Sequence, residues 1–363
     1  MKNKCIVITN PMIAANRSAE VTLSKFLRVI SPCYQEVHVV GGNVSVEEDL
    51  KSVCLHRVDM TRSPSRWKRL LDHVSVQLKL NRMTKKLVEP EVPVYFWVAD
   101  KMLLPYRTAL RKKGDVRFFI YGNVLKEGTS GWFTKLSGKL IAYMANHAHS
   151  VCAESPGVLQ EWQGLIAPRK LRVIHLYTEE TAGTVNRTPG QTIGMLCRLT
   201  EGKRVLESIR GFTRFHAEHP GYNLEIIGSG RQEQQCRELI AQCNAQSFIH
   251  MAGWVEHSEV TRRAAHWQYL LFPSDTEVMP NSVIEMMGQG IPVIASPVGG
   301  VRDLVRDGEN GWVLPGTTEE DIYRTLCKAV AAENYEIMAH AALAAVSEEF
   351  TLPGARENAR IYI

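Results

Sequence analysis

Several common signals are missing from this sequence of 363 residues. Its eight cysteines form no C-x-x-C pair and do not cluster with histidines along the chain, so we expect buried thiols in a reducing compartment rather than a disulfide framework. No stretch approaches the roughly 18 apolar residues that span a bilayer. The apolar run near Met1 stops at Asn10-Pro11, too early for a signal peptide. We therefore expect a cytoplasmic protein, with any membrane contact peripheral at the inner face of the membrane.

What the composition does contain is the balance of a folded protein. Apolar residues make up 45% and charged residues 22%, and the length suits two domains of roughly 150–200 residues. The charge divides unevenly, because residues 1–175 carry 27 Lys and Arg against 14 Asp and Glu, and residues 176–363 carry 16 against 24. The basic half indicates contact with an anionic surface or a phosphorylated acceptor; a solvated face that only keeps the protein soluble explains it equally well.

Short apolar runs alternate with longer helical patterns through both halves. Continuous apolar runs between helices are typical of parallel strands buried on both faces, so each half is predicted to be a doubly wound α/β domain. The expected strands are Cys5–Thr9, Glu36–Val40, Val94–Val98, Arg117–Tyr121 and Ser150–Ala153, then Thr192–Leu196, Asn223–Ile227, Phe248–Met251, Tyr269–Phe272 and Pro292–Ala295. We expect domains at 1–176 and 177–345, with a helix in 346–363 that packs back on the first domain.

Two such domains are expected to leave a cleft, and ligands of parallel sheets bind beyond the carboxyl ends of the strands. The loop after Leu196 carries Arg198 and Lys203, two cations that can converge on a diphosphate; surface charge at a helix start is the competing interpretation. Gly228-Ser229-Gly230 follows the next strand and lets a backbone pass close to a ligand, although a tight turn would use the same residues.

The stretch from Phe272 to Ala295 is the most informative. It predicts a strand, a loop carrying Glu277, and a short helix from about Ser282 to Gly290 that holds Glu285. Carboxylates suit hydroxyl groups because they accept hydrogen bonds without adding a donor. A capping box, Ser282-x-x-Glu285, would explain Glu285 without any ligand, and the same eight-residue spacing recurs at Glu225/Glu233 and Glu349/Glu357.

Taken together, the motifs of residues 192–315 resemble those of the family four retaining glycosyltransferases, also called glycosyl transferases group 1. The family's pattern runs from G-R-L and K-G through G-x-G and F-x-G-x-V to P-S-x-x-E, a second Glu eight residues on, A-x-G-x-P-V-V-A and G-G. It appears here, in order and at family spacing, as Cys197-Arg198-Leu199 with Lys203, Gly228-Ser229-Gly230, Met251 to Val255, Pro273 to Glu277 with Glu285, Met287 to Ala295, and Gly299-Gly300.

The resemblance implies the GT-B fold, two Rossmann-like domains facing across a cleft, and transfer of a hexose-type sugar from a UDP- or GDP-sugar with retention of configuration. It implies that Arg198 and Lys203 bind the diphosphate and offset charge on the leaving nucleotide, and that Glu277 contacts the transferred sugar. Glu285 would hold the ribose. The remaining donor contacts implied are Gly228, Gly230, Gly253, Trp254, Val255, Met279, Pro280, Asn281 and Ser282.

Two departures from the family pattern concern the loops. Gly202-Lys203-Arg204 stands where the family has Lys-Gly, and the glycine pair of the first loop is replaced by the segment from Asn10 to Ser18. The mechanism that the resemblance implies needs neither a metal nor another cofactor, and the chain has no Asp-x-Asp; the nearest equivalent is Asp275-x-Glu277.

The acceptor is expected to be a glycan or a lipid-linked molecule bound by the first domain. Residues 62–87 hold eight basic residues and one acid, and Trp67, Leu70, Leu71, Val74, Leu78 and Met83 lie near helical spacing. We hypothesise that this stretch touches an anionic membrane; a core helix with a basic outer face fits as well. Nucleic acid is not expected as a partner, because the second half is acidic and no interleaved aromatic–basic motif is present.

Two other functions remain open at this point, because a fold does not fix a function. The same two-domain fold hosts sugar-nucleotide epimerases, and it could also serve as a non-catalytic binding subunit. The order of the motifs argues against an epimerase, and the presence of Arg198, Lys203, Glu277 and Glu285 argues against an inactive scaffold. The residues do not identify the sugar, the nucleotide, the linkage formed or the oligomeric state.

Overall fold

The computed structural model describes residues 2–10, 17–50, 53–60, 66–121, 132–160, 162, 164–178, 185 and 189–363, and the chain divides into two compact units. The N-terminal unit comprises Met1–Tyr177 together with Leu352–Ile363, and the C-terminal unit comprises Thr178–Thr351. In the part of the chain that is described, no helix is long and apolar enough to cross a membrane.

The N-terminal unit is built on a seven-stranded sheet, in the order β3-β2-β1-β4-β5-β6-β7, whose paired strands are all parallel. The strands are β1 (Lys2–Ile8), β2 (Tyr34–Gly42), β3 (Val53–Val58), β4 (Pro93–Phe96), β5 (Asp115–Phe119), β6 (Ser150–Ala153) and β7 (Leu171–Val173). The helices are α1 (Arg17–Ile30), α2 (Arg66–Leu87), α3 (Leu103–Arg111), α4 (Trp132–His147), α5 (Pro156–Gln160) and α13 (Leu352–Arg360).

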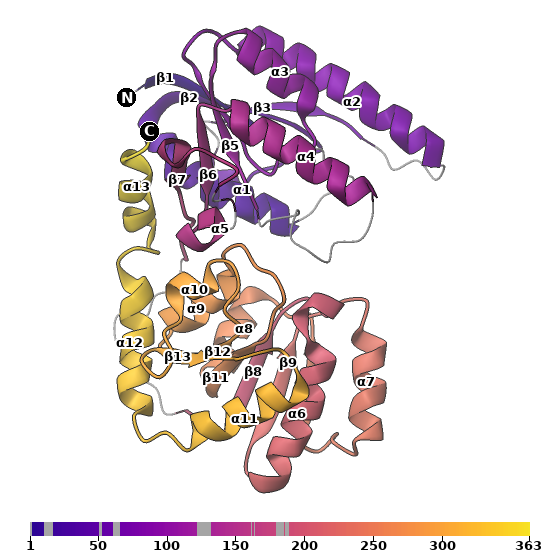
Figure 1. Cartoon of the computed structure of the whole chain (residues 1–363), viewed down its shortest axis with the longest axis vertical. Helices are drawn as coiled ribbons and strands as arrows, with labels where there is room; N and C mark the ends of the chain where they lie inside the picture. The colour runs from indigo at the N-terminus through magenta and orange to yellow at the C-terminus, as the bar shows by residue number, and fades with distance from the viewer. Residues whose placement is uncertain are drawn as a thin grey trace. The chain divides into compact units, whose positions relative to one another are not determined.

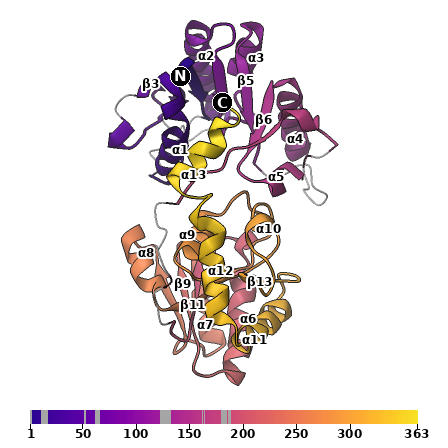
Figure 2. The same cartoon turned by 90° about the vertical axis from the view of Figure 1, so that its left-hand side faces the viewer.

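Both faces of this sheet are buried, which explains the unbroken apolar runs of its strands. Cys5 and Val7 of β1 pack in one cluster with α1 and with Ala355 and Ala359 of α13. On β4, Phe96 points to the other side of the strand and lies 5.1 Å, centroid to centroid, from the ring of Tyr106 on α3. Helices therefore cover both faces (Figures 1 and 2).

The C-terminal unit has a six-stranded sheet in the order β10-β9-β8-β11-β12-β13, whose paired strands are again all parallel. Its strands are β8 (Thr192–Leu196), β9 (Asn223–Ile227), β10 (Ile249–Gly253), β11 (Trp267–Phe272), β12 (Val293–Ala295) and β13 (Gly311–Val313). Its helices are α6 (Val205–Glu218), α7 (Glu233–Gln242), α8 (His257–Ala264), α9 (Asn281–Gly288), α10 (Val301–Leu304), α11 (Glu319–Val330) and α12 (Tyr335–Ser347).

Two apolar clusters lie on opposite faces of this second sheet. On one face, Ile193 and Met195 of β8 pack against Phe212 of α6 and Leu326 of α11. On the other, Phe272 of β11 belongs to a cluster with residues of α8, α9, α10 and α12. Each unit is thus a three-layer α/β structure, and the predicted fold class is confirmed.

The expected strands match the observed ones closely, but three strands were not predicted. The bounds of β6, β8 and β9 agree with the expected ranges, whereas β3, β7 and β13 were missed. The expected division at 345/346 also differs from the structure, because α12 continues to Ser347 and both Val346 and Phe350 pack in the core of the C-terminal unit. The segment that groups with the N-terminal unit begins at Leu352.

Candidate functional site

The predicted site residues of the second half lie in loops that follow β8, β9, β10 and β11. Because these strands are neighbours in one parallel sheet, their carboxyl ends lie along one edge. The C-terminal unit therefore presents four consecutive loops side by side, and most of the candidates lie on them.

Lys203 and Glu277 contact each other at this edge. Lys203 ends a short 3-10 helix (Glu201–Lys203) after β8, and its Nζ forms an ion pair with Oε1 of Glu277, which lies in the loop after β11. The Ser274 hydroxyl donates a second hydrogen bond, of 2.5 Å, to the same oxygen. The Lys203 and Glu277 side chains are 17% and 13% exposed, so the pair is largely shielded from water but still reachable from it.

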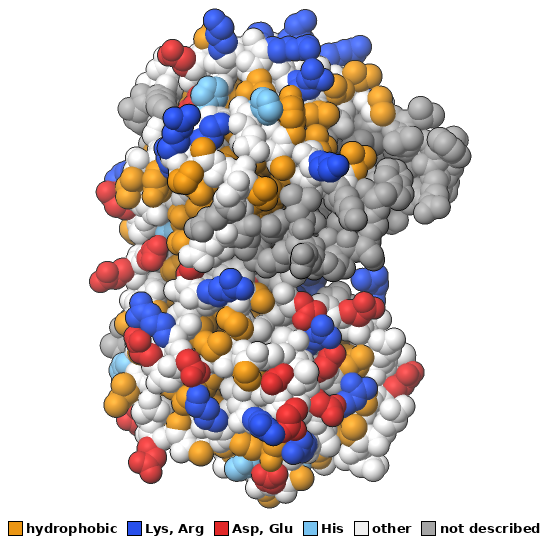
Figure 3. Space-filling model, in the orientation of Figure 1, with side chains coloured by type: hydrophobic (Ala, Val, Ile, Leu, Met, Phe, Trp, Pro, Cys, Tyr) orange, Lys and Arg blue, Asp and Glu red, His pale blue; other side chains and the backbone are white. Residues whose placement is uncertain are grey.

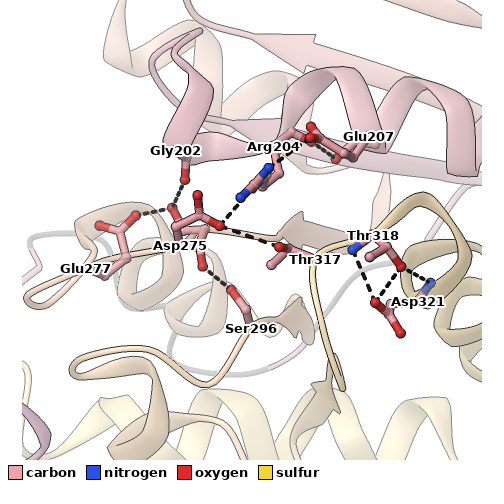
Figure 4. A network of polar contacts seen from close by, with 11 residues as sticks. Gly202, Arg204, Glu207, Asp275, Glu277, Ser296, Thr317, Thr318 and Asp321 are labelled. Carbon is pink, nitrogen blue, oxygen red and sulfur yellow. Dashed lines mark hydrogen bonds and ion pairs between the residues drawn. The ribbon is translucent and has the colours of Figure 1, made fainter. Parts of the chain in front are cut away.

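The same two loops are joined by a second set of polar contacts, and Figure 4 draws the one between Arg204 and Asp275. The Asp275 amide donates to the Gly202 carbonyl at 2.9 Å, and the Arg204 Nε donates to the Asp275 carboxylate at 2.7 Å. That carboxylate raises the pKa of the Arg204 guanidinium. Arg204 takes a left-handed backbone conformation, with φ of 52°, at the start of α6. Sequence reasoning assigned no role to Ser274 or Arg204, although both lie inside the motifs it used.

Gly228 and Gly230 let the loop after β9 lie against the loop after β8. A Cβ atom at Gly228, whose φ is +138°, would sit 1.9 Å from the Cys197 carbonyl oxygen, and one at Gly230 would sit 2.3 Å from that of Leu199. The Leu199 amide donates to the Ser229 carbonyl at 3.0 Å. Only glycine fits this approach of two backbones.

The loop after β10 adjoins the same group. The Gly228 amide donates to the Gly253 carbonyl at 2.8 Å. Trp254 follows Gly253 and is 68% exposed, and Val255 is half-buried against one of the apolar clusters. A large aromatic ring that faces solvent beside these loops can stack on a planar ligand.

Arg198 lies between Cys197 and Leu199 in the loop after β8 and is exposed. Among the described residues, no hydrogen bond or ion pair of its side chain is found. Burial raises the pKa of the neighbouring Cys197 thiol to about 12, and the charges of Lys203 and Glu277 act on it in opposite directions. Cys197, Lys203 and Ser274 are among the residues that line a small pocket here.

The helix that holds Glu285 starts earlier than expected. α9 begins at Asn281, with Pro280 preceding it, and no side chain caps its start. Ser282 is therefore already inside the first turn, so the alternative explanation of Glu285 by a capping box with Ser282 does not hold. Glu285 is 9% exposed.

The remaining candidates lie at the start of α9. Met279 and Pro280 are buried, Asn281 is exposed and Ser282 is half-buried. The amides of Val283 and Ile284 donate to the Pro280 carbonyl at 3.1 and 3.3 Å. The N–H groups of Asn281 and Ser282 precede them in the first turn, where a helix supplies no backbone acceptor, so they can donate to a ligand or to water. The Gly300 amide, just before α10, donates to the Val278 carbonyl at 2.6 Å, which fixes the loop between β11 and α9.

The C-terminal unit is similar to a known protein family. Residues 178–342 match the model described as glycosyl transferases group 1. Over 158 residues the chain is 30% identical to the putative colanic acid biosynthesis glycosyltransferase WcaL of Salmonella typhimurium, covering 41% of this chain and 39% of that protein. It is 25% identical to the lipopolysaccharide core biosynthesis glycosyltransferase LpsE of Rhizobium meliloti, over 72% of this chain and 71% of that one. The matches span only 18% to 39% of the length of the first curated relatives.

Solved structures extend the similarity over the whole chain. The complex of Anabaena HepE with UDP superimposes with a TM-score of 0.75 at 13% identity, covering 98% of both chains. Sucrose-phosphate synthase from Thermosynechococcus elongatus gives a TM-score of 0.76 at 15% identity, covering 99% of this chain and 98% of the other. At these identities the likeness establishes the fold.

Proposed function

Because residues 178–342 belong to the glycosyl transferases group 1 family and the chain has the GT-B fold, we propose that it transfers a sugar from a nucleotide-sugar to an acceptor. The similar proteins are named for the synthesis of colanic acid, amylovoran and lipopolysaccharide core. These names support a glycan or lipid-linked molecule as the acceptor. The glucose bound in a HepE structure and the galactosyltransferase WaaB among the similar structures support a hexose-type sugar as the transferred group.

The observation that carries this proposal is the contact between Lys203 and Glu277. A cation suited to a diphosphate and a carboxylate suited to sugar hydroxyls lie together at the carboxyl ends of β8 and β11. Without a donor they neutralise each other. When the donor binds, its phosphate takes over Lys203, and the released Glu277 carboxylate accepts hydrogen bonds from the sugar.

Retention of configuration is part of the proposal. The acceptor oxygen bonds to the anomeric carbon on the face from which the phosphate departs, and the acceptor proton passes to the leaving phosphate oxygen. Arg198, exposed at the same loop, and Lys203 offset the negative charge that builds on the diphosphate. Fixed charges directed at a developing charge are the largest contribution that such a site makes to the rate.

We also propose that the transfer needs no metal at the donor site. Two facts support this. Asp275 is engaged by Arg204 and Glu277 by Lys203, so both carboxylates of the nearest metal-like motif already have cationic partners. Turnover that is unchanged by a chelator at millimolar concentration would agree with this proposal, and turnover abolished by the chelator and restored by Mg²⁺ would refute it.

For the donor, we propose a uridine or guanosine diphosphate sugar, with UDP as the first candidate because the similar HepE structures contain UDP or UDP-glucose. Gly253 to Val255 would face the base, and the Trp254 ring is exposed for stacking. Glu285 would hold the ribose, and the start of α9, from Met279 to Ser282, would bind the sugar or phosphate.

On the acceptor side, we propose that α2 contacts an anionic membrane. Val74 and Leu78, one turn apart, are each 47% exposed, whereas Val76 and Leu80 are buried. Lys79 and Arg82 are exposed next to them. Figure 3 shows Lys and Arg side chains gathered over the N-terminal unit, whereas both signs mix over the C-terminal unit. Arg62 and the side chains of Trp67, Leu70 and Leu71, which belong to the same predicted stretch, lie outside the described residues.

Liposome sedimentation tests the membrane contact. We expect binding to vesicles that contain anionic lipid and little binding to neutral vesicles, with the difference reduced at high salt. Equal binding to both kinds of vesicle, or to neither, would contradict this part of the proposal without touching the sugar transfer.

The experiment that tests the main proposal incubates the purified chain with a panel of UDP- and GDP-sugars. A transferase releases nucleotide slowly from its own donor even without acceptor. An isomerised sugar would instead identify an epimerase, and binding without any conversion would identify a binding subunit. Either result would overturn the proposed reaction.

A further inference from the structure

A second cluster of reactive side chains lies away from the donor loops, where α6 ends beside α11. Glu218 is the last residue of α6, His219 follows it, and Cys327 lies on α11. One ligand atom from each of the three lies within 4.8 Å of the other two, and this is the only such group of His, Cys, Asp and Glu found in the residues that the structure describes.

Close packing of the two helices brings these residues together. A Cβ at Gly211 of α6 would sit 2.7 Å from the Glu319 carbonyl at the start of α11, so the helices approach closely only because this residue is glycine. Further along, the Arg214 guanidinium lies over the Tyr323 ring, 4.0 Å from its centroid. The register that results places Glu218 and His219 opposite Cys327.

Three features of the surroundings suit a metal ion. The Tyr323 hydroxyl donates to Glu218 Oε1 at 2.6 Å, which orients the carboxylate as hydrogen bonds from outer groups orient metal ligands. The His219 ring stacks on Phe215, with centroids 4.7 Å apart. Glu218 is exposed and the other two are half-buried, so an ion can enter from solvent and keep a water as its fourth ligand.

From this geometry we propose that Glu218, His219 and Cys327 bind one Zn²⁺ ion, which clamps α6 to α11. A thiolate, an imidazole and a carboxylate are the three ligand types that Zn²⁺ takes, at about 2.0 to 2.3 Å. Tetrahedral ligands at those lengths lie about 3 to 4 Å apart, so side-chain movements of about 1 Å close the present group around the ion. As the sulfur–zinc bond forms, the thiol proton passes to solvent.

This site is separate from the donor loops. α6 starts beside Lys203 and has 14 residues, so its end lies about 20 Å further along the helix axis at 1.5 Å per residue. The ion therefore has a structural role, and it is compatible with metal-free sugar transfer.

Titration of the reduced, chelator-treated chain with ZnCl₂ alone, followed by calorimetry, tests the proposal. We expect one ion per chain, and Cys327→Ser should weaken binding at least tenfold. Cys243→Ser is the matched control, because Cys243 is also half-buried but lies at the end of α7; it should bind as the wild type does. Tyr323→Phe should weaken binding by about tenfold through the lost orientation of Glu218.

A cobalt spectrum, a second variant and the Tm cover the case in which Cys327→Ser loses affinity only because it misfolds. Co²⁺ in place of Zn²⁺ should give a sulfur-to-cobalt charge-transfer band that disappears in Cys327→Ser, and His219→Gln should repeat the loss of affinity. Zn²⁺ should also raise the Tm of the wild type by several degrees but not that of Cys327→Ser. No binding to the wild type, or equal affinity for wild type and Cys327→Ser, would overturn the proposal.

Discussion

The Glu277 carboxylate at the donor loops has two polar partners. Glu277 pairs with Lys203 and also accepts from Ser274, so its carboxylate is already held in one place before any sugar binds. Such positioning is what a site needs to hold substrate hydroxyls in fixed geometry. The ion pair is therefore consistent with a role of Glu277 in binding the donor. Substitution of Glu277 can distinguish an effect on turnover from an effect on stability.

Glu277→Gln keeps the size of the side chain and removes its charge. We expect nucleotide release from the donor to fall about 100-fold, equivalent to about 2.7 kcal/mol, with the Tm changed by only a few degrees. Steady-state kinetics of nucleotide release measure the effect. Glu309→Gln is the control, because Glu309 is exposed and pairs only locally with Arg306; an equal loss in both variants would contradict the assigned role.

A buried carboxyl in the N-terminal unit makes stability depend on pH. Burial raises the pKa of Glu154 from 4.5 to about 8. Between these values the folded state keeps a proton that the unfolded state has lost, so the free energy of unfolding falls as pH rises through this window.

Glu154→Gln removes that dependence. We expect the variant to be more stable than the wild type at pH 8.5, by about 4 to 5 kcal/mol since one pKa unit corresponds to about 1.36 kcal/mol, and nearly equally stable near pH 4.5. Urea unfolding at several pH values measures this. A difference that stays constant across the pH range would show that the carboxyl does not titrate in this way.

At the scale of elements, the donor loops depend on close backbone contact between the ends of β8 and β9. Gly228→Ala would place a methyl group against the Cys197 carbonyl and hold a positive φ with an L side chain. We expect about 1 to 3 kcal/mol of lost stability and weaker nucleotide binding. Gly202→Ala is the control for stability, because nothing lies within 4 Å of its added methyl. Thermal unfolding with and without UDP measures both effects, and equal stability of the two variants would contradict the packing argument.

A helix or strand can be predicted from the sequence when its own residues form a clear pattern. β8 and β9 were predicted within their observed bounds because their apolar runs are continuous and end in polar or glycine turns. β13 has only three residues, the first a glycine, whereas the equally short β12 continues an apolar run from Ile291. β3 lies at the edge of its sheet, and Cys54 and Arg57 are exposed there, so its run is interrupted.

The candidate site was predicted less completely for the same reason. The motifs predicted candidates on the loops after β8, β9 and β11, and these loops lie along one edge of the sheet. The pairing of Lys203 with Glu277, and that of Arg204 with Asp275, joins residues far apart in sequence, so only the folded sheet reveals it. The capping box considered for Ser282 and Glu285 does not form, because α9 begins at Asn281 and Pro280 holds the position before it.

At the scale of the whole molecule, the chain leaves the N-terminal unit at Tyr177 and returns to it at Leu352. Ala355 and Ala359 of α13 are fully buried in the same cluster as Phe26 of α1. The last helix therefore contributes to the core of the first unit, although it follows the second unit in sequence.

Deletion of Leu352–Ile363 should accordingly weaken the N-terminal unit and leave the C-terminal unit unchanged. We expect amide hydrogen exchange in α1 to accelerate at least tenfold, with protection in β8 and β9 maintained. Exchange followed by mass spectrometry measures both regions in one sample. Equal acceleration in the two units, or none in α1, would contradict the assignment of α13 to the first core.

The central claim is that the loops after β8, β9 and β11 bind a nucleotide-sugar through Lys203 and Glu277. Calorimetric titration of the whole chain with UDP tests it most directly. We expect one site on the wild type, affinity at least tenfold lower in Lys203→Ala, and wild-type affinity in the control Glu309→Gln, which alters an exposed ion pair. Wild-type affinity in Lys203→Ala, or no binding of UDP and likewise none of GDP, would contradict it.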